Sequence, residues 1–312
     1  MDHLLYLLIV YRIVNTFCVQ TYFNPDEFWQ GPEVAHRMVY GVGHLTWEWS
    51  PSAQIRSAVH PSFFALFYWC VKTIGIDTRF VVMAGPRVLQ SILAAVGDFY
   101  VYRWSLQIFL SKNVAKWSLF LSLSSFFNFF CITRTFSNSA ETVVTIVALY
   151  YWPMSISTSI KKFFTASAIK KDDDLLLSNS AENTRKTSRN RNSELKSAES
   201  TEEKINKNDI EEEEGIDESS WWLALSLAAL AVVLRPTSLL IWLPLGIRAL
   251  NNNNPQNQMI LVGRAIIVGI IALVLWLYID SLFYGEFTFV LWNFIQFNLL
   301  HGLDKLYGSH PW

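Results

Sequence analysis

Apolar segments of about the length that a helix needs to cross a lipid bilayer, roughly 20 residues, recur along most of this chain. We count seven of them, at approximately residues 4–19, 61–76, 87–108, 114–132, 140–157, 221–247 and 259–279. The first segment lacks the basic start and small-residue cleavage site of a removable signal peptide, so we expect a retained membrane helix. The pattern predicts an all-α fold, a polytopic membrane helical bundle with about seven membrane helices.

The charged residues are distributed very unevenly. Residues 161–220 contain 11 basic and 15 acidic side chains, which is 26 of the 51 charged residues of a chain whose net charge is -1. This segment is rich in Ser, Asn, Glu and Lys and nearly free of aromatic residues, a composition that predicts disorder. We therefore divide the chain into an N-terminal membrane module (1–158) with a long loop at 20–60, a disordered charged insert (159–220), and C-terminal membrane segments followed by a loop (221–312).

The segment count also predicts which loops share a side of the membrane. With a cytoplasmic N-terminus, loops 20–60 and 280–312 lie together on the opposite side. The same count places residues 133–138 on the cytoplasmic edge and the charged insert on the non-cytoplasmic side. The basic residues of two short connections then face the cytoplasm, in agreement with the positive-inside rule: Lys72, Arg79 and Arg87, and Arg248 and Arg264.

Two adjacent carboxylates follow the first apolar segment. Asn24-Pro25 favours a turn, and Pro25 can begin a short helix whose first turn holds Asp26 and Glu27. A carboxylate at a membrane surface can remove a proton from a sugar hydroxyl that attacks an activated glycosyl donor. The alternative is a capping role, in which either carboxylate accepts hydrogen bonds from free backbone N–H groups. The length of loop 20–60 exceeds that of a simple connector, which favours a function.

Other polar residues lie inside or beside the apolar segments. A charge in hydrocarbon costs on the order of a few kcal/mol, so Asp98, Arg103, Arg134 and Arg235 are expected to face the bundle interior, a partner or water. Pairing between helices or snorkelling is the structural alternative. The histidines and cysteines lack metal-ligand or disulfide spacing, and the chain has no glycine-rich phosphate loop and no basic stripe. We therefore expect neither a metal site nor a nucleic-acid partner.

Several motifs occur in an order and spacing that resemble one family. They are NPDEFWQGPEVAHRMVYGVGHLTWEWS, IRSAVHP, TRTFSNSAETVVTIVALYYWP, LRPTSLLIWLP and LWNFIQFNLLHGLDKLYGSHPW. Together they extend over most of the chain outside the charged insert. They resemble the dolichyl-phosphate-mannose-dependent mannosyltransferases of glycosylphosphatidylinositol (GPI) and N-glycan assembly, glycosyltransferase family 22. The likeness is greatest to the members that add the third mannose of the GPI anchor in α-1,2 linkage.

The resemblance implies a multi-pass enzyme of the endoplasmic reticulum membrane, with the GT-C architecture and a lumenal active site in loop 20–60. Its donor substrate is dolichyl phosphate mannose, its acceptor is a lipid-linked glycan, the GPI precursor, and neither a cofactor nor a metal is expected. Carried over to the matching positions, Asp26 is the catalytic base and Glu27 orients the acceptor or the base. The β-linked donor and α-linked product imply inversion by a single displacement, for which one base suffices.

The same resemblance suggests groups that bind the two substrates. The phosphate that leaves the donor needs cationic or hydrogen-bonding partners. Candidate partners are Arg56, His60, Arg134 and His310. Candidates for binding the acceptor sugar are Glu48, Trp47 and Trp49. The structural alternatives are ion pairing for Arg134, a turn before a proline for His310, and anchoring at the membrane interface for the two tryptophans.

Three other functions stay open at this stage. A related enzyme could transfer mannose to the dolichol-linked N-glycan precursor. A transporter would also place ionisable residues within the membrane, but it should show internal repeats, which we do not find. A non-catalytic scaffold subunit could keep the aromatic loops without the chemistry of the carboxylates. Because the family continues past the HPW motif, we also expect this chain to be truncated relative to the family.

Overall fold

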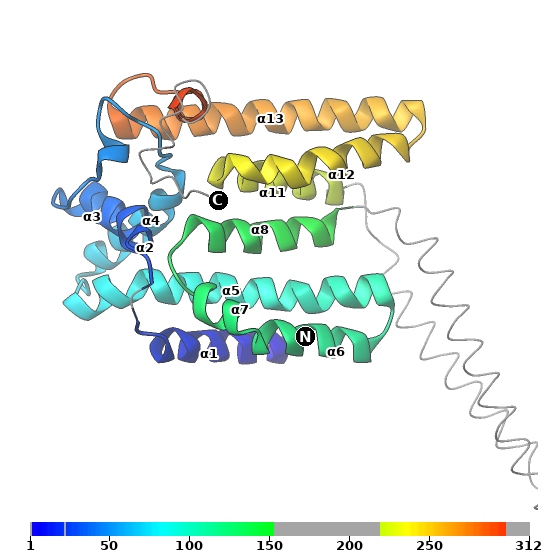
Figure 1. Ribbon diagram of the computed structural model, residues 1–312, viewed down its shortest axis with the longest axis horizontal. Coiled ribbons are helices and arrows are strands. Elements are labelled where there is room, and N and C mark those ends of the chain that lie inside the picture. Colours follow the sequence, from blue (N-terminus) through cyan, green and yellow to red (C-terminus); the bar gives the residue numbers. More distant parts are fainter. Residues whose placement is uncertain (1, 22, 153–218, 298–312) are drawn as a thin grey trace, which may run out of the picture.

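The computed structural model of the protein describes residues 2–21, 23–152 and 219–297, and within these ranges it is all helical, with no strand (Figure 1). The all-α prediction is therefore confirmed for the described part. The charged insert predicted at 159–220, apart from its last two residues, and the candidate His310 lie outside the described residues. The helices are α1 (Asp2–Cys18), α2 (Asp26–Trp29), α3 (Pro32–Tyr40), η1 (Trp47–Trp49), α4 (Val59–Ile74), α5 (Arg79–Phe109), α6 (Lys112–Ser124), α7 (Phe126–Cys131), α8 (Ser137–Tyr151), α11 (Ser219–Leu234), η2 (Pro236–Ser238), α12 (Leu239–Asn251), α13 (Pro255–Tyr284) and α14 (Val290–Ile295).

Helix length separates two helices from the others. Helices α5 and α13, with 31 and 30 residues, are long and apolar enough to cross a membrane, judged by length and composition alone. The other apolar helices are shorter, with 17 residues in α1 and 16 in α11. The prediction of about seven membrane helices is therefore not confirmed by helix length and hydropathy, and it stays a prediction.

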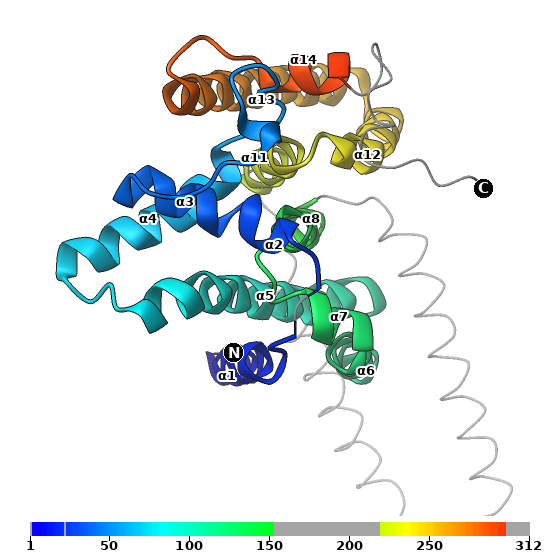
Figure 2. The same cartoon turned by 60° about the vertical axis from the view of Figure 1, so that its left-hand side comes forward.

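The long helices lie side by side, and α2, α3 and α4 gather at one end of them, which we call the site end (Figures 1 and 2). Helix α1 runs antiparallel to α5, because Arg87 Nη2 donates to the Val19 carbonyl near the site end while Arg12 pairs with Asp98 further along both helices. Helix α13 ends at the site end, where Asp280 contacts loop 20–60.

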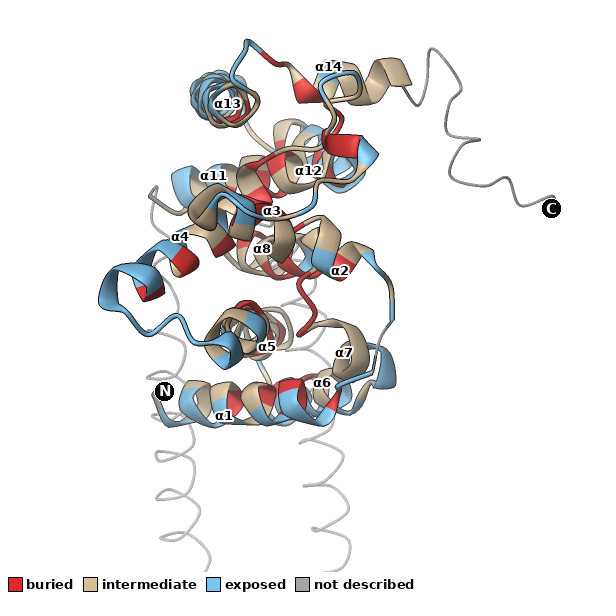
Figure 3. Ribbon diagram, turned by 90° about the vertical axis from the view of Figure 1, so that its left-hand side faces the viewer, coloured by how far each residue is buried: buried red, intermediate tan, exposed pale blue. Residues whose placement is uncertain are grey.

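The apolar segment predicted to cross the membrane at 61–76 does not pass along the bundle. It forms α4, which lies across the site end and packs against α3 (Figure 3). Lys72 Nζ donates to the Val39 carbonyl at 2.8 Å, so the C-terminal end of α4 stays close to loop 20–60. Arg87 also lies near the site end, so the prediction that the connection with Lys72, Arg79 and Arg87 faces away from this loop is wrong. An apolar helix of 16 residues meets the hydropathy criterion even when, as in α4, one face is buried against protein and the other is exposed.

The segment predicted at 221–247 is two helices that run in opposite directions. Helix α11 ends at Leu234 and α12 begins at Leu239, because Pro236 has no N–H to donate and disfavours helical geometry at Arg235. The prediction counted one pass too many at α4 and one too few at 221–247, so the two errors cancel. Loop 20–60 and the connection that follows α13 consequently share one end of the bundle, as expected.

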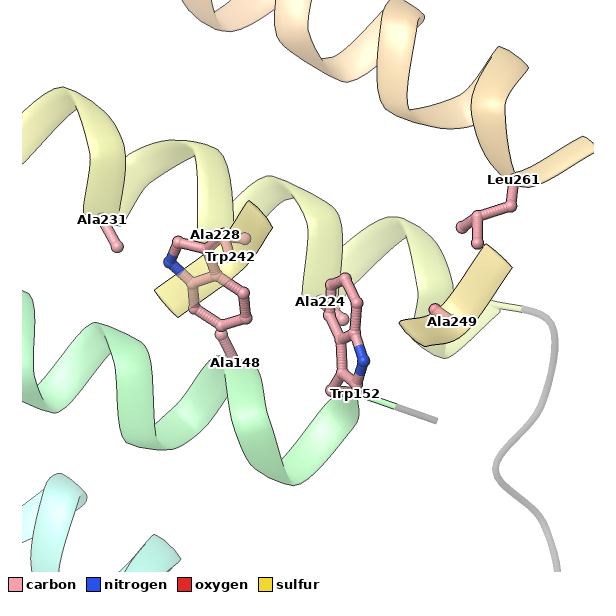
Figure 4. Close-up of a cluster of buried hydrophobic side chains, with 8 residues drawn as sticks. All are labelled: Ala148, Trp152, Ala224, Ala228, Ala231, Trp242, Ala249 and Leu261. Carbon is pink, nitrogen blue, oxygen red and sulfur yellow. The ribbon is translucent and has the colours of Figure 1, made fainter. Parts of the chain in front are cut away.

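For the part of the chain between α4 and α12, the predicted side of the membrane is wrong at two places. Residues 133–138 lie at the site end, because Arg134 contacts Glu27. The described residues on either side of the charged insert lie at the opposite end, where the rings of Trp152 and Trp221 are 5.5 Å apart and Trp152 belongs to the same buried cluster as Ala249 (Figure 4).

Small side chains allow α8 and α11 to pack closely. The buried cluster between them and their neighbours is Ala148, Trp152, Ala224, Ala228, Ala231, Trp242, Ala249 and Leu261 (Figure 4). Spacings of three and four residues place the alanines of α11 on one face of that helix. Alanine at such positions lets two helix backbones approach, as is common between helices in membranes.

A buried ion pair joins α1 to α5. Arg12 Nε lies 2.6 Å from Asp98 Oδ2, and Ser122 Oγ donates to the other oxygen of the same carboxylate at 3.2 Å. Arg103 Nη2 donates to the Tyr150 hydroxyl at 2.8 Å. Asp98 and Arg103 therefore face the bundle interior, as expected, and their contacts are between helices.

The outer face of α13 is largely exposed (Figure 3).

Candidate active site

Helix α2 carries two carboxylates that are adjacent in sequence but not in environment. Asn24 Oδ1 accepts a hydrogen bond from the Asp26 N–H at 3.0 Å, and the helix begins directly after Pro25, so the predicted turn and short helix are confirmed. Successive residues of an α-helix point about 100° apart, since one turn holds 3.6 residues. Asp26 is accordingly half-buried, whereas Glu27 is 3% exposed.

Glu27 forms a buried ion pair with Arg134. Arg134 Nη1 lies 3.0 Å from Glu27 Oε1 and 2.8 Å from Oε2. The same guanidinium donates to the Thr21 carbonyl at 2.8 Å and to the Phe130 carbonyl at 3.0 Å, and Thr135 Oγ1 donates to the Glu27 carbonyl. The pair thus fastens α2 to the connection before α8. Arg134 therefore forms a structural ion pair, which was the alternative to phosphate binding, and Glu27 is almost closed to a substrate.

Asp26 is the carboxylate of α2 that solvent reaches. Burial and, next, the negative charge of Glu48 raise the pKa of Asp26 above its usual value, while the positive charge of Arg56 and a hydrogen bond with the Gln30 side chain act in the opposite direction. A carboxylate with a raised pKa holds a proton more firmly after accepting it, which suits a general base.

Glu48 connects Asp26 to Arg56. Glu48 Oε2 accepts a hydrogen bond from Gln30 Nε2 at 3.3 Å, and Glu48 Oε1 lies 2.7 Å from Arg56 Nη2. The Arg56 side chain is 32% exposed, whereas that of Glu48 is 9% exposed. Asp26, Gln30, Glu48 and Arg56 therefore form a continuous set of interacting groups, which we call the polar row. It brings together the predicted base, one predicted acceptor residue and one predicted phosphate partner.

The two tryptophans beside Glu48 have different surroundings. Trp49 is 3% exposed, and its ring meets those of Phe283 and Tyr284 at 5.3 and 6.5 Å. Trp47 is 47% exposed, with its ring 5.5 Å from that of Phe297. Trp49 thus anchors η1 to the end of α13, and Trp47 is the member of the predicted pair with ring surface to offer a sugar.

Asp280, which the sequence analysis did not single out, fixes the backbone beside Arg56. Its Oδ1 accepts from the Ala58 N–H at 2.8 Å and from Ser57 Oγ at 2.9 Å, and the side chain is 1% exposed. The Tyr284 hydroxyl donates to the Arg56 carbonyl at 2.8 Å. A carboxylate near the end of a long apolar helix is the sequence signal that could have identified Asp280.

His60 packs under the junction of α2 and α3 and is not part of the polar row. It is 6% exposed, and its ring lies edge-on to Phe64 with centroids 5.1 Å apart. A Cβ atom on Gly31 would lie 3.3 Å from His60 Cε1 and 3.2 Å from the Phe64 ring, so glycine is what permits this close approach. Of the described phosphate candidates, Arg56 alone lies in the polar row.

The described residues contain no group of three His, Cys, Asp or Glu side chains placed to hold a metal ion. His36 instead lies in α3, and His44 lies in the loop that follows this helix. His36 Nδ1 is 2.8 Å from the Val42 carbonyl, and the His44 N–H donates to Glu33 Oε1 at 2.9 Å. These contacts hold the loop against α3.

Comparison with known proteins adds a family to this geometry. The profile of the Alg9-like mannosyltransferase family matches residues 3–312. The chain is 36% identical to a mannosyltransferase of Arabidopsis thaliana and 34% identical to GPI alpha-1,2-mannosyltransferase 3 of Homo sapiens, and it is 31% identical to GPI mannosyltransferase 3 of Candida albicans. These alignments cover 97–99% of the chain but 45–49% of each relative, so the chain spans about half the length of the curated relatives it matches. No solved structure matches the chain.

Proposed function

Since the chain belongs to the Alg9-like mannosyltransferase family, we propose that it carries the catalytic base of an α-1,2-mannosyltransferase of GPI-anchor biosynthesis. The donor is dolichyl phosphate mannose, the acceptor is the lipid-linked GPI precursor, and the sugar added is its third mannose. The enzyme lies in the endoplasmic reticulum membrane with its active site in the lumen. The names of the relatives support the linkage and the pathway, and the polar row supports the chemistry.

The proposed reaction is a single inverting displacement. The Asp26 carboxylate takes the proton from an acceptor hydroxyl while the hydroxyl oxygen attacks C1 of the mannose. The bond between C1 and the phosphate oxygen breaks, and its electron pair leaves with dolichyl phosphate. No covalent sugar–enzyme intermediate forms, so a second carboxylate nucleophile is unnecessary. This agrees with a site in which Glu27 is committed to Arg134.

The observation that carries the proposal is the contrast between the two carboxylates of α2. Asp26 is half-exposed and has a raised pKa, and it lies within electrostatic range of Arg56. The Arg56 guanidinium provides positive charge for the departing phosphate, and the Trp47 ring provides a surface for an acceptor sugar. A base, a cation and an aromatic face on neighbouring segments suit sugar transfer from a lipid phosphate.

We also propose the GT-C architecture with the site end facing the lumen. The stretches that run between the two ends of the bundle are α1, α5, α6 with α7, α8, α11, α12 and α13. We propose that these stretches cross the membrane and that α4 does not; of the described helices, α5 and α13 are the two long and apolar enough to do so alone. The insert then emerges on the cytoplasmic side, together with the basic connection between α12 and α13.

The test is the glycolipid that accumulates in cells from which the gene is deleted. Loss of the proposed enzyme should leave a GPI precursor with two mannoses and remove GPI-anchored proteins from the cell surface, while the N-glycan precursor keeps its normal size. The full-length wild-type protein should restore both, and an Asp26→Asn variant should not. Accumulation of a shortened dolichol-linked N-glycan with normal GPI anchors would assign the protein to N-glycan assembly instead.

A further inference from the structure

Arg235 occupies the break between α11 and α12. Its backbone is extended, with φ -150° and ψ 112°, because the following proline disfavours a helical conformation. The break lies at the site end, where α11 finishes and α12 turns back. Arg235 was expected to face the bundle interior, a partner or water. The structure gives it a half-buried position at the same end as the polar row.

The contacts of Arg235 place its side chain at the start of α8, shortly after Thr135, whose hydroxyl donates to the Glu27 carbonyl of α2. Arg235 Nη1 donates to Asn138 Oδ1 in the first turn of α8. The guanidinium lies within electrostatic range of the Glu141 carboxylate and of the Arg56 guanidinium. Arg56 therefore lies within electrostatic range of Asp26 and of Arg235, and it is paired with Glu48. Elements as distant in sequence as loop 20–60, α8 and the α11–α12 break meet there.

Two half-buried guanidinium groups within range of each other repel, and each has a glutamate nearby. Arg56 has Glu48, and Arg235 has Glu141, so these four groups are neutral together, and Asp26 adds a negative charge that is lost when it takes the proton of the acceptor. A bound anion between the arginines would satisfy both cations, and planar guanidinium groups match the geometry of phosphate oxygens. A site of this kind favours a ligand whose negative charge increases during the reaction.

From this arrangement we propose that Arg235, together with Arg56, binds the phosphate of the lipid leaving group. The inference rests on the proposed function. The sugar donor is a phosphodiester with one negative charge, and the released lipid phosphate is a monoester that carries up to two. The electron pair of the broken C1–O bond becomes that additional charge. Arg235 should therefore interact more strongly with the released lipid phosphate than with the intact donor, and it should stabilise the transition state.

The experiment compares Arg235→Gln, Arg235→Lys and the control Arg248→Gln in the full-length protein reconstituted in liposomes. Arg248 is exposed near the C-terminal end of α12, the helix that follows the break at Arg235. The measured quantities are kcat, the KM for dolichyl phosphate mannose, and the inhibition constant of added dolichyl phosphate. Loss of a charge-assisted contact should raise that inhibition constant about tenfold or more in Arg235→Gln. Arg235→Lys should recover part of the effect, and Arg248→Gln should match wild type.

Folding is controlled by requiring that each variant elutes as one species and binds the acceptor lipid like wild type. A folded Arg235→Gln variant whose inhibition constant equals that of wild type overturns the proposal. A uniform loss of kcat with an unchanged inhibition constant also overturns it, because that pattern indicates a structural role. Failure of the proposed function would look different: the wild-type protein itself would transfer no mannose from this donor.

Discussion

The two carboxylates of α2 illustrate how one helical step separates two roles. Glu27 is paired with Arg134 and closed off from solvent, while Asp26 remains half-exposed at the polar row. Sequence reasoning chose Asp26 as the base through a family resemblance and assigned Glu27 a supporting role near the substrate. It could not foresee the partner of Glu27, because Arg134 is 107 positions away and its predicted side of the membrane was wrong.

The first prediction concerns the pH dependence of transfer. Asp26 acts as a base when it is deprotonated, so kcat/KM should fall as pH decreases through its pKa, which burial and Glu48 raise above the usual value. Glu48→Gln removes a negative neighbour and leaves Arg56 unpaired, and both changes lower the pKa of Asp26. The acid limb of the profile should therefore move to lower pH in this variant.

The control for this profile is Glu286→Gln, which removes an exposed carboxylate that is not among the groups acting on Asp26. Its acid limb should coincide with that of wild type. An acid limb of Glu48→Gln that stays in place or moves to higher pH would contradict the assignment of Asp26 as the titrating base.

The second prediction concerns the stability of the protein. Glu27→Gln leaves the Arg134 guanidinium buried without a negative partner, which should lower the free energy of unfolding by about 3–5 kcal/mol. Thermal unfolding in detergent measures the change. Asp26→Asn is the matched control. Because Asp26 is half-exposed, this variant should unfold at nearly the wild-type temperature. An equally stable Glu27→Gln protein without transferase activity would assign Glu27 to the chemistry.

At the scale of elements, the apolar pattern predicted where helices form but not how the chain passes between them. The helical stretches were found because their apolar residues are numerous and continuous. The hydropathy of α4 does not reveal that one of its faces packs against α3. The apolar run through α11 and α12 does not show the change of direction at Pro236. The polar row depends on contacts between α2, η1 and loop residues that no local pattern encodes.

The third prediction concerns the support that α13 gives to Arg56. Asp280→Asn weakens the hydrogen bonds to Ala58 N–H and Ser57 Oγ, so loop 20–60 loses its fixed position beside α13. Because Asp280 acts through Arg56, we expect Asp280→Asn to reduce kcat/KM about tenfold in wild type. The same substitution should have little further effect in an Arg56→Gln background.

A double-mutant cycle measures this coupling directly. Effects of Asp280→Asn and Arg56→Gln that simply multiply would show that Asp280 does not position Arg56. Glu286→Gln serves as a carboxylate control near the same end of the molecule and should leave kcat/KM unchanged.

At the scale of the whole molecule, the bundle has two distinct ends. The site end brings together α2, α3, α4, the start of α8, the break at Arg235 and the end of α13. The other end carries the α12–α13 turn and the residues that border the charged insert. Sequence reasoning placed loop 20–60 and the end of α13 together correctly, because its two errors of direction cancel.

The fourth prediction uses this arrangement to determine sidedness. Single cysteines at the exposed positions Ser52, Asp77 and Asn252 are introduced after Cys18, Cys70 and Cys131 are replaced with serine. In sealed vesicles, a membrane-impermeant maleimide should label Ser52→Cys and Asp77→Cys from one side and Asn252→Cys from the other. Labelling of Asp77→Cys together with Asn252→Cys would mean that α4 crosses the membrane, contrary to the structure.

The central claim is that the Asp26 carboxylate is the base for mannosyl transfer from a lipid phosphate donor. The most direct measurement is single-turnover transfer of radiolabelled mannose from dolichyl phosphate mannose to the GPI precursor by the reconstituted full-length protein. Asp26→Asn should lower this rate by about 10²–10⁴-fold while donor binding and unfolding temperature stay near wild type. A folded Asp26→Asn protein that transfers mannose at the wild-type rate would contradict the account.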